Sequence, residues 1–292
     1  MDLLFFAAIA FIIGTLLGSF MNVCLTRWPA GESIVRPGSH CRNCAHTLSW
    51  WENIPILSWL FLRGRCHQCK TSIGWRYPLV ELLCGIFFAA AILTAPILPY
   101  SPPILEPPPL YFPLLATAVY SWLVLALAFL DAENFWLPDL LTIPGIALGL
   151  FFRHFGDLLF LRHDMRHAIR SIAISLLEIA AAALLILLIR WVYFLVRHEE
   201  GMGLGDAKLM AMLGAWLGWQ RALLTFTLAI FLATAFATVL LLRGKPDENE
   251  SPAQPAWART MLPFGTFLCI GGMASYFFGG QLIAYYLRAV GL

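Results

Sequence analysis

Three aspartates stand in or beside long apolar stretches of this sequence. Asp131 ends the run LALAFLDAEN, Asp139 follows Pro138 soon afterwards, and Asp206 stands in GMGLGDAKLM. A charged side chain in a membrane span costs roughly 2.5–3.5 kcal/mol at mid-span, so acids at such positions are candidates for function. Two carboxylates that meet can share one proton, so that one activates water while the other donates to a carbonyl oxygen. Asp131 and Asp206 on neighbouring helices would provide this aspartic-protease chemistry.

Helix capping is the alternative explanation for each aspartate. A carboxylate near a helix N-terminus is stabilised by the helix dipole. Capping fits Asp139, which follows a proline at a predicted helix start, and it also fits Asp206 at the start of its apolar run. Asp131 lies at the unfavourable, C-terminal end of its predicted helix. Something other than capping must therefore keep Asp131 in place.

The residues around Asp206 extend the motif. Gly201, Gly203 and Gly205 let the backbone deform and approach a partner chain closely. We therefore expect Gly203 and Gly205 to lie near an extended substrate strand. Lys208 is the third candidate neighbour of the substrate. It either tunes the charge of Asp206 or extends its amine to the membrane interface.

Four cysteines form a second constellation, in HCRNCAHTLSWWENIPILSWLFLRGRCHQCK. They make two CxxC pairs with residues 45 to 65 between them: Cys41, Cys44, Cys66 and Cys69. This pattern suits a tetrahedral four-thiolate zinc site, which is coordinatively closed and therefore structural. Two disulfides are the alternative, which the reducing cytoplasm disfavours. The flanking histidines are not needed as ligands, because four sulfurs complete the zinc shell.

The composition predicts a polytopic membrane protein. Sixty per cent of the 292 residues are hydrophobic and 12% are charged, against roughly a quarter charged in soluble domains. The net charge of +2 is too small to indicate a nucleic-acid partner. A span needs about 20 apolar residues as a helix. About eight runs qualify, at roughly 3–25, 79–98, 110–130, 135–152, 169–196, 205–220, 221–242 and 262–287.

These runs predict an all-α fold of about eight transmembrane helices with a small zinc-ribbon-like insertion. Residues 1–26 are expected to form the first span, 27–78 the four-cysteine domain and 79–292 the transmembrane peptidase domain. The fourth and sixth runs are short and contain proline or glycine. The first run begins at Met1 without a basic segment, so we expect it to be a retained span and not a cleaved signal peptide.

The distribution of basic residues predicts the orientation. The insertion at 27–78 carries seven Lys and Arg residues against two acids, which indicates the cytoplasmic side. The Pro-rich segment 96–113 has no Lys or Arg and would then lie outside. A predicted loop from Arg153 to Arg170 disagrees, because it carries four arginines on the outer side. The aspartates are expected near the cytoplasmic boundary.

Six segments in order carry a resemblance to a known family. They are GSFMNVCLTRWP, the four-cysteine box with WWENIPILSWLFLRGRC, GWRYPLVELL, LDAENFWLPDLLT, GLGDAKLMAMLGAWLGW and LPFGTFL. Together they cover nearly the whole chain. In these segments the chain resembles the bacterial type IV prepilin peptidases, also called prepilin leader peptidase/N-methyltransferases, which are membrane aspartic proteases of the GxGD class.

The resemblance implies a bifunctional enzyme of the bacterial inner membrane with its active site facing the cytoplasm. It implies that Asp131 and Asp206 are catalytic, that Asp139 is not, and that the four cysteines mark a member that also methylates. The expected reaction removes the basic leader of type IV prepilins or type II secretion pseudopilins after a Gly. The new N-terminal residue, usually Phe, is then methylated with S-adenosylmethionine.

The S-adenosylmethionine site has a weaker basis in the sequence. No glycine-rich loop of the Rossmann kind follows a strand. We therefore expect the methyl donor to bind between the insertion and the adjoining helix ends. The candidates are Glu52, Asn53, Arg76 and Glu81, each of which is equally suited to a structural hydrogen bond.

Two other functions compete with this interpretation. A proton-coupled transporter would also place carboxylates in the membrane, but it predicts an inverted repeat, and the sequence shows none. A zinc-ribbon membrane scaffold without chemistry would leave both aspartate motifs without a purpose. We therefore expect a protease whose partners are prepilins and the lipid bilayer.

Overall fold

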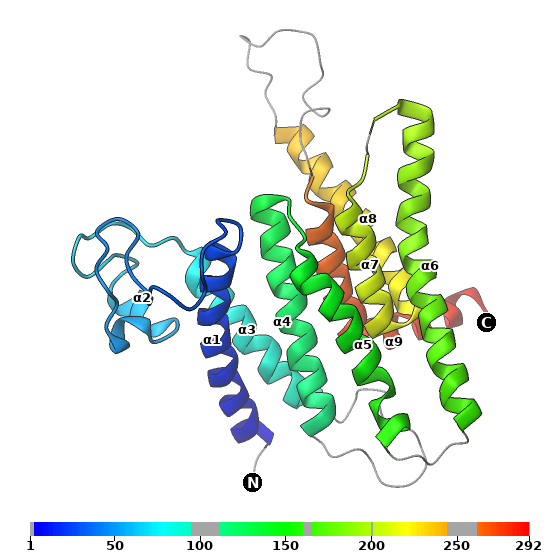
Figure 1. The fold of residues 1–292 in the computed structure, drawn as a ribbon, viewed down its shortest axis with the longest axis horizontal. Coiled ribbons are helices and arrows are strands. Elements are labelled where there is room, and N and C mark those ends of the chain that lie inside the picture. The colour runs from blue at the N-terminus through cyan, green and yellow to red at the C-terminus, as the bar shows by residue number, and fades with distance from the viewer. Residues whose placement is uncertain (1–2, 95–110, 160–164, 200, 244–261, 292) are drawn as a thin grey trace. The chain divides into compact units, whose positions relative to one another are not determined.

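A computed structural model describes residues 3–94, 111–159, 165–199, 201–243 and 262–291. Its elements in chain order are α1 (Leu3–Arg27), the 3₁₀ helix η1 (Trp50–Asn53), α2 (Leu57–Phe61), α3 (Arg76–Thr94), α4 (Tyr111–Asn134), α5 (Asp139–Leu159), α6 (Met165–Arg197), α7 (Leu204–Leu217), α8 (Trp219–Arg243) and α9 (Phe264–Val290). Figure 1 shows these helices. The all-helical fold predicted from the sequence is confirmed.

Six of the described helices are long and apolar enough to cross a membrane: α1, α3, α4, α6, α8 and α9. Each coincides with a predicted span. The two short predicted spans, 135–152 and 205–220, correspond to α5 and α7, which do not meet this criterion within the described chain. The α7 helix has only 14 residues, or about 21 Å of rise, against a hydrocarbon core of about 30 Å. The predicted count of about eight spans is thus reduced to six candidates.

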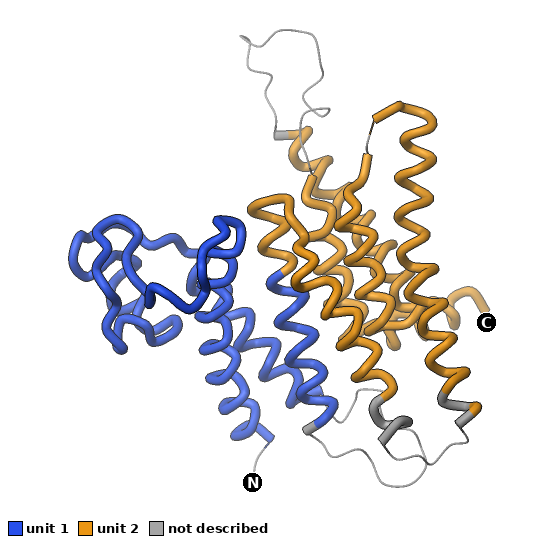
Figure 2. Tube along the Cα trace, viewed as in Figure 1, with its two compact units in different colours: residues 1–126 blue, residues 127–292 orange. Residues whose placement is uncertain are grey.

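The chain forms two compact units, which meet in sequence at Ala126 and Leu127 (Figure 2). In the first unit, α1 and α3 pack closely through glycines. A Cβ atom on Gly14 would lie 2.6 Å from the carbonyl oxygen of Cys84, and one on Gly18 would lie 2.7 Å from Cα of Glu81. Small residues four apart allow this backbone approach between membrane helices. The insertion 28–75 therefore begins and ends at one helix pair.

In the second unit, α7 is the central helix. Every residue from 209 to 216 is buried, and α7 contacts α5, α6, α8 and α9 (Figure 1). Trp216 Nε1 donates to the carbonyl oxygen of Gly145 in α5 at 2.8 Å. A helix that is apolar on all sides is expected to be enclosed by others, which is what the four neighbouring helices do for α7.

The predicted loop from Arg153 to Arg170 is wrong for most of its length. Arg153 lies inside α5, and Arg166 and Arg170 lie inside α6, while Arg162 falls outside the described residues. Arg153 Nη1 lies 2.6 Å from Glu178 Oε2. This ion pair explains how one of the arginines that disagreed with the predicted orientation is accommodated. The segments 96–110 and 244–261 also lie outside the described residues.

Candidate functional site

The carboxylate of Asp131 is buried in the last turn of α4, where the start of α9 holds it. The Thr266 N–H donates to Asp131 Oδ2 at 2.6 Å, and the Thr266 hydroxyl lies 3.0 Å from the same oxygen. That hydroxyl also lies 3.1 Å from the carbonyl oxygen of Ala128, one turn earlier. The helix dipole does not favour a carboxylate at this end of α4. The donors at the N-terminus of α9 supply the missing stabilisation.

Asp206 is buried in the first turn of α7. Its Oδ2 accepts the N–H of Gly203 at 3.2 Å, which is the capping contact expected for an acid at this position. Capping does not account for its surroundings, however. The carboxyl group of Asp131 lies close enough for its negative charge to repel that of Asp206, and both carboxyl groups lie close enough to interact electrostatically with the buried thiol of Cys269. Two buried acids in one unit therefore influence each other.

Two glycines keep the space beside these acids free of side chains. A Cβ atom on Gly265 would lie 2.9 Å from both Cγ and Oδ2 of Asp131, and 2.9 Å from Cδ1 of Leu137. A Cβ atom on Gly205 would lie 3.0 Å from Cβ of the same leucine. Leu137 thus packs against both glycines. It links the start of α7, which carries Asp206, to the start of α9, which holds Asp131.

Asp139 and Lys208 form an ion pair with each other, which is separate from the hydrogen bonds of Asp131 and Asp206 described above. Asp139 begins α5, as predicted, and its Oδ1 accepts from Lys208 Nζ at 2.5 Å. Both side chains are partly exposed, at 57% and 42%, so the pair contributes under about 1 kcal/mol. Lys208 therefore joins α7 to α5, a role that the sequence alone did not suggest.

The four cysteines come together in the first unit. Their sulfurs all lie within 4.8 Å of one another, with Cys41 Sγ 3.7 Å from Cys69 Sγ and Cys44 Sγ 3.9 Å from Cys66 Sγ. Tetrahedral zinc at about 2.3 Å from each sulfur requires sulfur separations of about 3.8 Å. The predicted cluster between the first and second spans is confirmed, and its geometry fits zinc.

The two CxxC segments have the same backbone geometry. In the first, Cys41 N–H donates to the His46 carbonyl and Ala45 adopts a positive φ of 55°. In the second, Cys66 N–H donates to the Thr71 carbonyl and Lys70 adopts a φ of 60°. We call these two turns the knuckles. Hydrogen bonds from Thr71 and Asn43 lower the pKa of the Cys69 thiol to about 5, which favours the thiolate form that a metal ligand requires.

Glu52 supports the knuckles from the 3₁₀ helix η1. Its Oε2 accepts the N–H of Ser49 at 2.7 Å and lies 3.1 Å from His46 Nε2. Burial acts to raise the pKa of the Glu52 carboxyl, but the hydrogen bonds from Ser49 and the neighbouring His46 outweigh it, so this pKa lies below its usual value. Glu52 is therefore a buried carboxylate at neutral pH.

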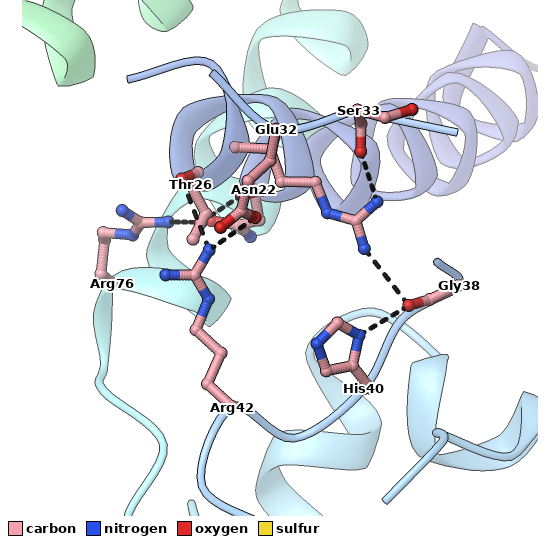
Figure 3. Close-up of polar contacts among 9 residues, drawn as sticks. Asn22, Thr26, Glu32, Ser33, Gly38, His40, Arg42 and Arg76 are labelled. Carbon is pink, nitrogen blue, oxygen red and sulfur yellow. Dashed lines mark hydrogen bonds and ion pairs between the residues drawn. The ribbon is translucent and has the colours of Figure 1, made fainter. Parts of the chain in front are cut away.

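A cavity of about 330 Å³ lies in the first unit between the end of α1, the insertion and the start of α3. Three of the four predicted methyl-donor residues line it, namely Glu52, Asn53 and Glu81. The fourth, Arg76, is not among its lining residues. Its Nη2 donates to the Thr26 hydroxyl at 2.9 Å (Figure 3), which ties α3 to α1.

The prediction from sequence missed three residues. Gly265 and Thr266 belong to the LPFGTFL segment, which was noted only as a family motif, and the spacing in the chain does not reveal their contact with Asp131. Asn22 belongs to GSFMNVCLTRWP. Its Nδ2 donates to the carbonyl oxygen of Tyr77 at 3.0 Å, and its side chain lines the cavity. A buried asparagine in an apolar span was the signal that could have found it.

Comparison with known proteins agrees with this arrangement. Residues 12–95 match the Bacterial Peptidase A24 N-terminal domain, and residues 118–238 match the Type IV leader peptidase family. A prepilin leader peptidase/N-methyltransferase of Stutzerimonas stutzeri is 34% identical over 97% of this chain and 94% of its own length. The protein of the same name from Pseudomonas aeruginosa is 34% identical over 98% of this chain and 95% of its own. No solved structure matches the chain.

The fold and the cysteine cluster define a class, the multi-pass helical membrane proteins with a zinc-ribbon-like insertion between the first two spans. The relatives match along their full length and carry one name. The chain belongs to the type IV leader peptidase family, peptidase A24. The resemblance seen in the sequence is confirmed.

Proposed function

We propose that this protein is a prepilin leader peptidase that also N-methylates its product. The relatives named above carry both activities in their names. The observation that supports cleavage most directly is the pair of buried acids in the second unit, Asp131 held by Thr266 of α9 and Asp206 by its own capping contact with Gly203. The expected substrates are type IV prepilins or type II secretion pseudopilins, cut after a Gly.

The hydrogen bonds suggest how the two acids divide the chemistry. Two donors of Thr266 converge on Oδ2 of Asp131, and donors of this kind favour the ionised carboxylate. Asp206 accepts a single backbone N–H. In this proposal Asp131 takes a proton from water as the water oxygen attacks the scissile carbonyl. Asp206, protonated, donates to the carbonyl oxygen. Asp131 then gives the proton that it took from water to the amide nitrogen, the C–N bond breaks to release the new amine, and Asp206 regains its proton as the carbonyl re-forms.

The methylating activity is assigned to the first unit. The four cysteines would hold a structural zinc ion that fixes the two knuckles together. S-adenosylmethionine, when bound, supplies a methyl group that the new amine takes up with loss of a proton as the carbon–sulfur bond breaks. Buried oxygen atoms that face the cavity fit a ligand rich in hydrogen-bond donors.

We place both sites on the cytoplasmic side of the bacterial inner membrane. The insertion between α1 and α3 is rich in Lys and Arg, as cytoplasmic segments are. A pilin precursor has a basic leader followed by an apolar helix that remains in the membrane. Its cleavage site therefore lies at the cytoplasmic boundary, where Asp131 and Asp206 are expected.

The test is cleavage of a purified prepilin by three variants in detergent. Asp131→Asn and Asp206→Asn should each lower the rate by at least about 1,000-fold, because removing one member of a catalytic pair disables the unit. Asp139→Asn is the matched control. It should cleave within about threefold of the wild type, because its partly exposed ion pair with Lys208 contributes little. The readout is the mass of the product.

Thermal unfolding of each variant separates loss of chemistry from loss of fold. The proposal expects the two inactive variants to unfold within a few degrees of the wild type. Normal cleavage by either Asp131→Asn or Asp206→Asn would refute the aspartate mechanism. Proton-driven transport by the wild type without cleavage would favour the competing transporter function.

A further inference from the structure

The cavity in the first unit has the size and lining of a small-molecule site. Its volume of about 330 Å³ is within the usual range for ligand pockets. Apolar walls come from Leu48, Trp59 and Leu62. Polar side chains from α1, η1 and α3 face the same space. A mixed lining of this kind suits a nucleoside, which has a flat apolar ring and several hydrogen-bond donors.

Two buried acceptor atoms in this cavity lack a donor. Among the described residues, no hydrogen-bond donor reaches Asn22 Oδ1 or Glu52 Oε1, although Asn22 is only 4% exposed and Glu52 only 6%. The ring nitrogen Nδ1 of His67 lies 4.0 Å from Glu52 Oε1. Leaving a buried acceptor unpaired costs about 1–3 kcal/mol. Both residues line the cavity, so a ligand there can supply the missing donors.

The charges around the cavity favour a cation. The guanidinium of Arg27 donates to the carbonyl oxygens of Ser33 and Gly38, and Arg42 pairs with Glu32 (Figure 3). These contacts occupy the two arginines that line the cavity. Glu52 and Glu81 also line it, and the carboxylate of Glu81 accepts the backbone N–H of Ile56 at 2.7 Å and has the Ser19 side chain as a further hydrogen-bond partner. Among the residues that the structure describes, no Lys or Arg forms an ion pair with either acid.

We propose that this cavity binds the methyl donor, an adenosyl sulfonium, with Asn22 Oδ1 and Glu52 Oε1 accepting hydrogen bonds from its hydroxyl or amino groups. Glu52 and Glu81 then face the positive charge of the ligand. The proposal rests on the methylating activity proposed above, to which it adds a location and two contact atoms. Glu52 has a double role, because one carboxylate oxygen caps η1 and the other faces the ligand.

Binding of S-adenosylmethionine to the full-length, zinc-loaded protein tests the location by calorimetry in detergent. Glu52→Gln can keep the bond from Ser49 through its amide oxygen while presenting an amide N–H in place of Oε1. The affinity of the Glu52→Gln variant for S-adenosylmethionine should fall by about 10- to 100-fold. Glu32→Gln is the matched control. It removes an acid that is partly exposed and ion-paired on the same cavity wall, and its affinity should stay within about twofold.

A second pair of variants tests the cavity by filling it. A Cβ atom on Gly74, which lines the cavity, or on Gly38, which does not, would meet nothing within 4 Å. Gly74→Phe should therefore abolish binding, whereas Gly38→Phe should not. Zinc content and prepilin cleavage should match the wild type in both controls, Glu32→Gln and Gly38→Phe.

The possible outcomes distinguish failure of the proposed binding site from failure of the proposed methylating activity. Wild-type binding that survives both Glu52→Gln and Gly74→Phe would overturn the location and leave the methylating activity intact. A wild-type protein that cleaves prepilin but neither binds S-adenosylmethionine nor methylates would overturn the methylating activity, and this proposal with it. Weaker binding by both variants, with both controls unchanged, would support the site.

Discussion

At the scale of single residues, Thr266 is the group that holds Asp131 in position. It offers two donors, a backbone N–H and a hydroxyl, to the same oxygen of the carboxylate. The N–H comes from the first turn of α9, where the helix dipole also favours a negative charge. An acid at the unfavourable end of one helix is thus stabilised by the favourable end of another.

Replacing this hydroxyl should weaken catalysis and change its pH dependence. Thr266→Val keeps the shape and the N–H but removes the hydroxyl, and a hydrogen bond to a charged group contributes about 1.5–3 kcal/mol. We expect kcat for prepilin cleavage to fall by about 10- to 100-fold. The acidic limb of the pH–rate profile should move to higher pH, because the ionised base has lost a donor. A full pH–rate series on a peptide substrate measures both effects.

Thr266→Ser is the control for that experiment. Serine retains the hydroxyl, so kcat should stay within about threefold of the wild type with an unshifted profile. If Thr266→Val lowers kcat without moving the acidic limb, then Thr266 is a packing residue and does not support the base.

The residue types at the site were largely predictable from the sequence, whereas their partners were not. Four thiols in two CxxC pairs have one common use, and an acid inside an apolar run is costly enough to be noticed. Thr266 carries no such signal, because threonine is common in membrane helices and its contact with Asp131 spans 135 positions of the chain. Contacts of that separation depend on how α4 and α9 pack.

At the scale of elements, the close approach of α9 to α4 depends on Gly265. The position precedes Thr266 and lies against the carboxyl group of Asp131. A methyl group placed there would be closer to Cγ than van der Waals contact allows, so α9 or the carboxylate must move. The glycine is therefore part of how Asp131 is positioned.

Gly265→Ala should reduce prepilin cleavage by at least about tenfold, because a shift of about 1 Å at a reacting group can cost 100-fold in rate. Gly280→Ala in the same helix is the matched control. Its Cβ would meet only the end of the Arg221 side chain, at 3.4 Å, and we expect unchanged cleavage. Initial rates for both variants, with thermal unfolding in parallel, make the comparison. Equal rates for the two variants would show that the start of α9 tolerates the shift.

The elements themselves were predictable where long apolar runs specified them. The six candidate spans coincide with predicted spans because length and hydropathy suffice to identify them. The interpretation of α5 and α7 was less accurate. Arg153 suggested a loop because an isolated arginine is unfavourable in a span, and its partner Glu178 lies on another helix. A short helix such as α7 resembles a span in sequence, because burial by other helices and burial by lipid select the same residues.

At the scale of the whole molecule, each compact unit contains one candidate site. The four cysteines and the cavity belong to the unit that ends at Ala126, and both buried aspartates belong to the unit that begins at Leu127. The two matched family segments follow the same division: residues 12–95 lie within the first unit, and residues 118–238 lie mostly within the second. We therefore expect the two activities to be separable by substitution.

Replacing Cys41 and Cys44 together by Ser should remove bound zinc and abolish methylation while prepilin cleavage persists. The four cysteines of the two knuckles would be the ligands of this ion, and zinc-finger peptides gain about 10–16 kcal/mol from their metal at pH 7. Asp131→Asn should show the reverse pattern, with no cleavage but normal methylation of a synthetic mature pilin N-terminus. Elemental analysis and product masses provide the readouts. Unchanged methylation in a zinc-free double variant would refute the role given to the cysteines.

The glycine contacts between α1 and α3 have a consequence for how the insertion folds. They hold together the two helices from which it emerges, and the hydrogen bonds of Asn22 to Tyr77 and of Arg76 to Thr26 join α1 to α3 again closer to the insertion. Most of the chain entropy lost in closing a long loop is lost when its ends meet. Packing of α1 on α3 would therefore close the insertion into a loop without any metal. A zinc ion would then need to order only a tethered segment, and the affinity required of four cysteines would be correspondingly smaller.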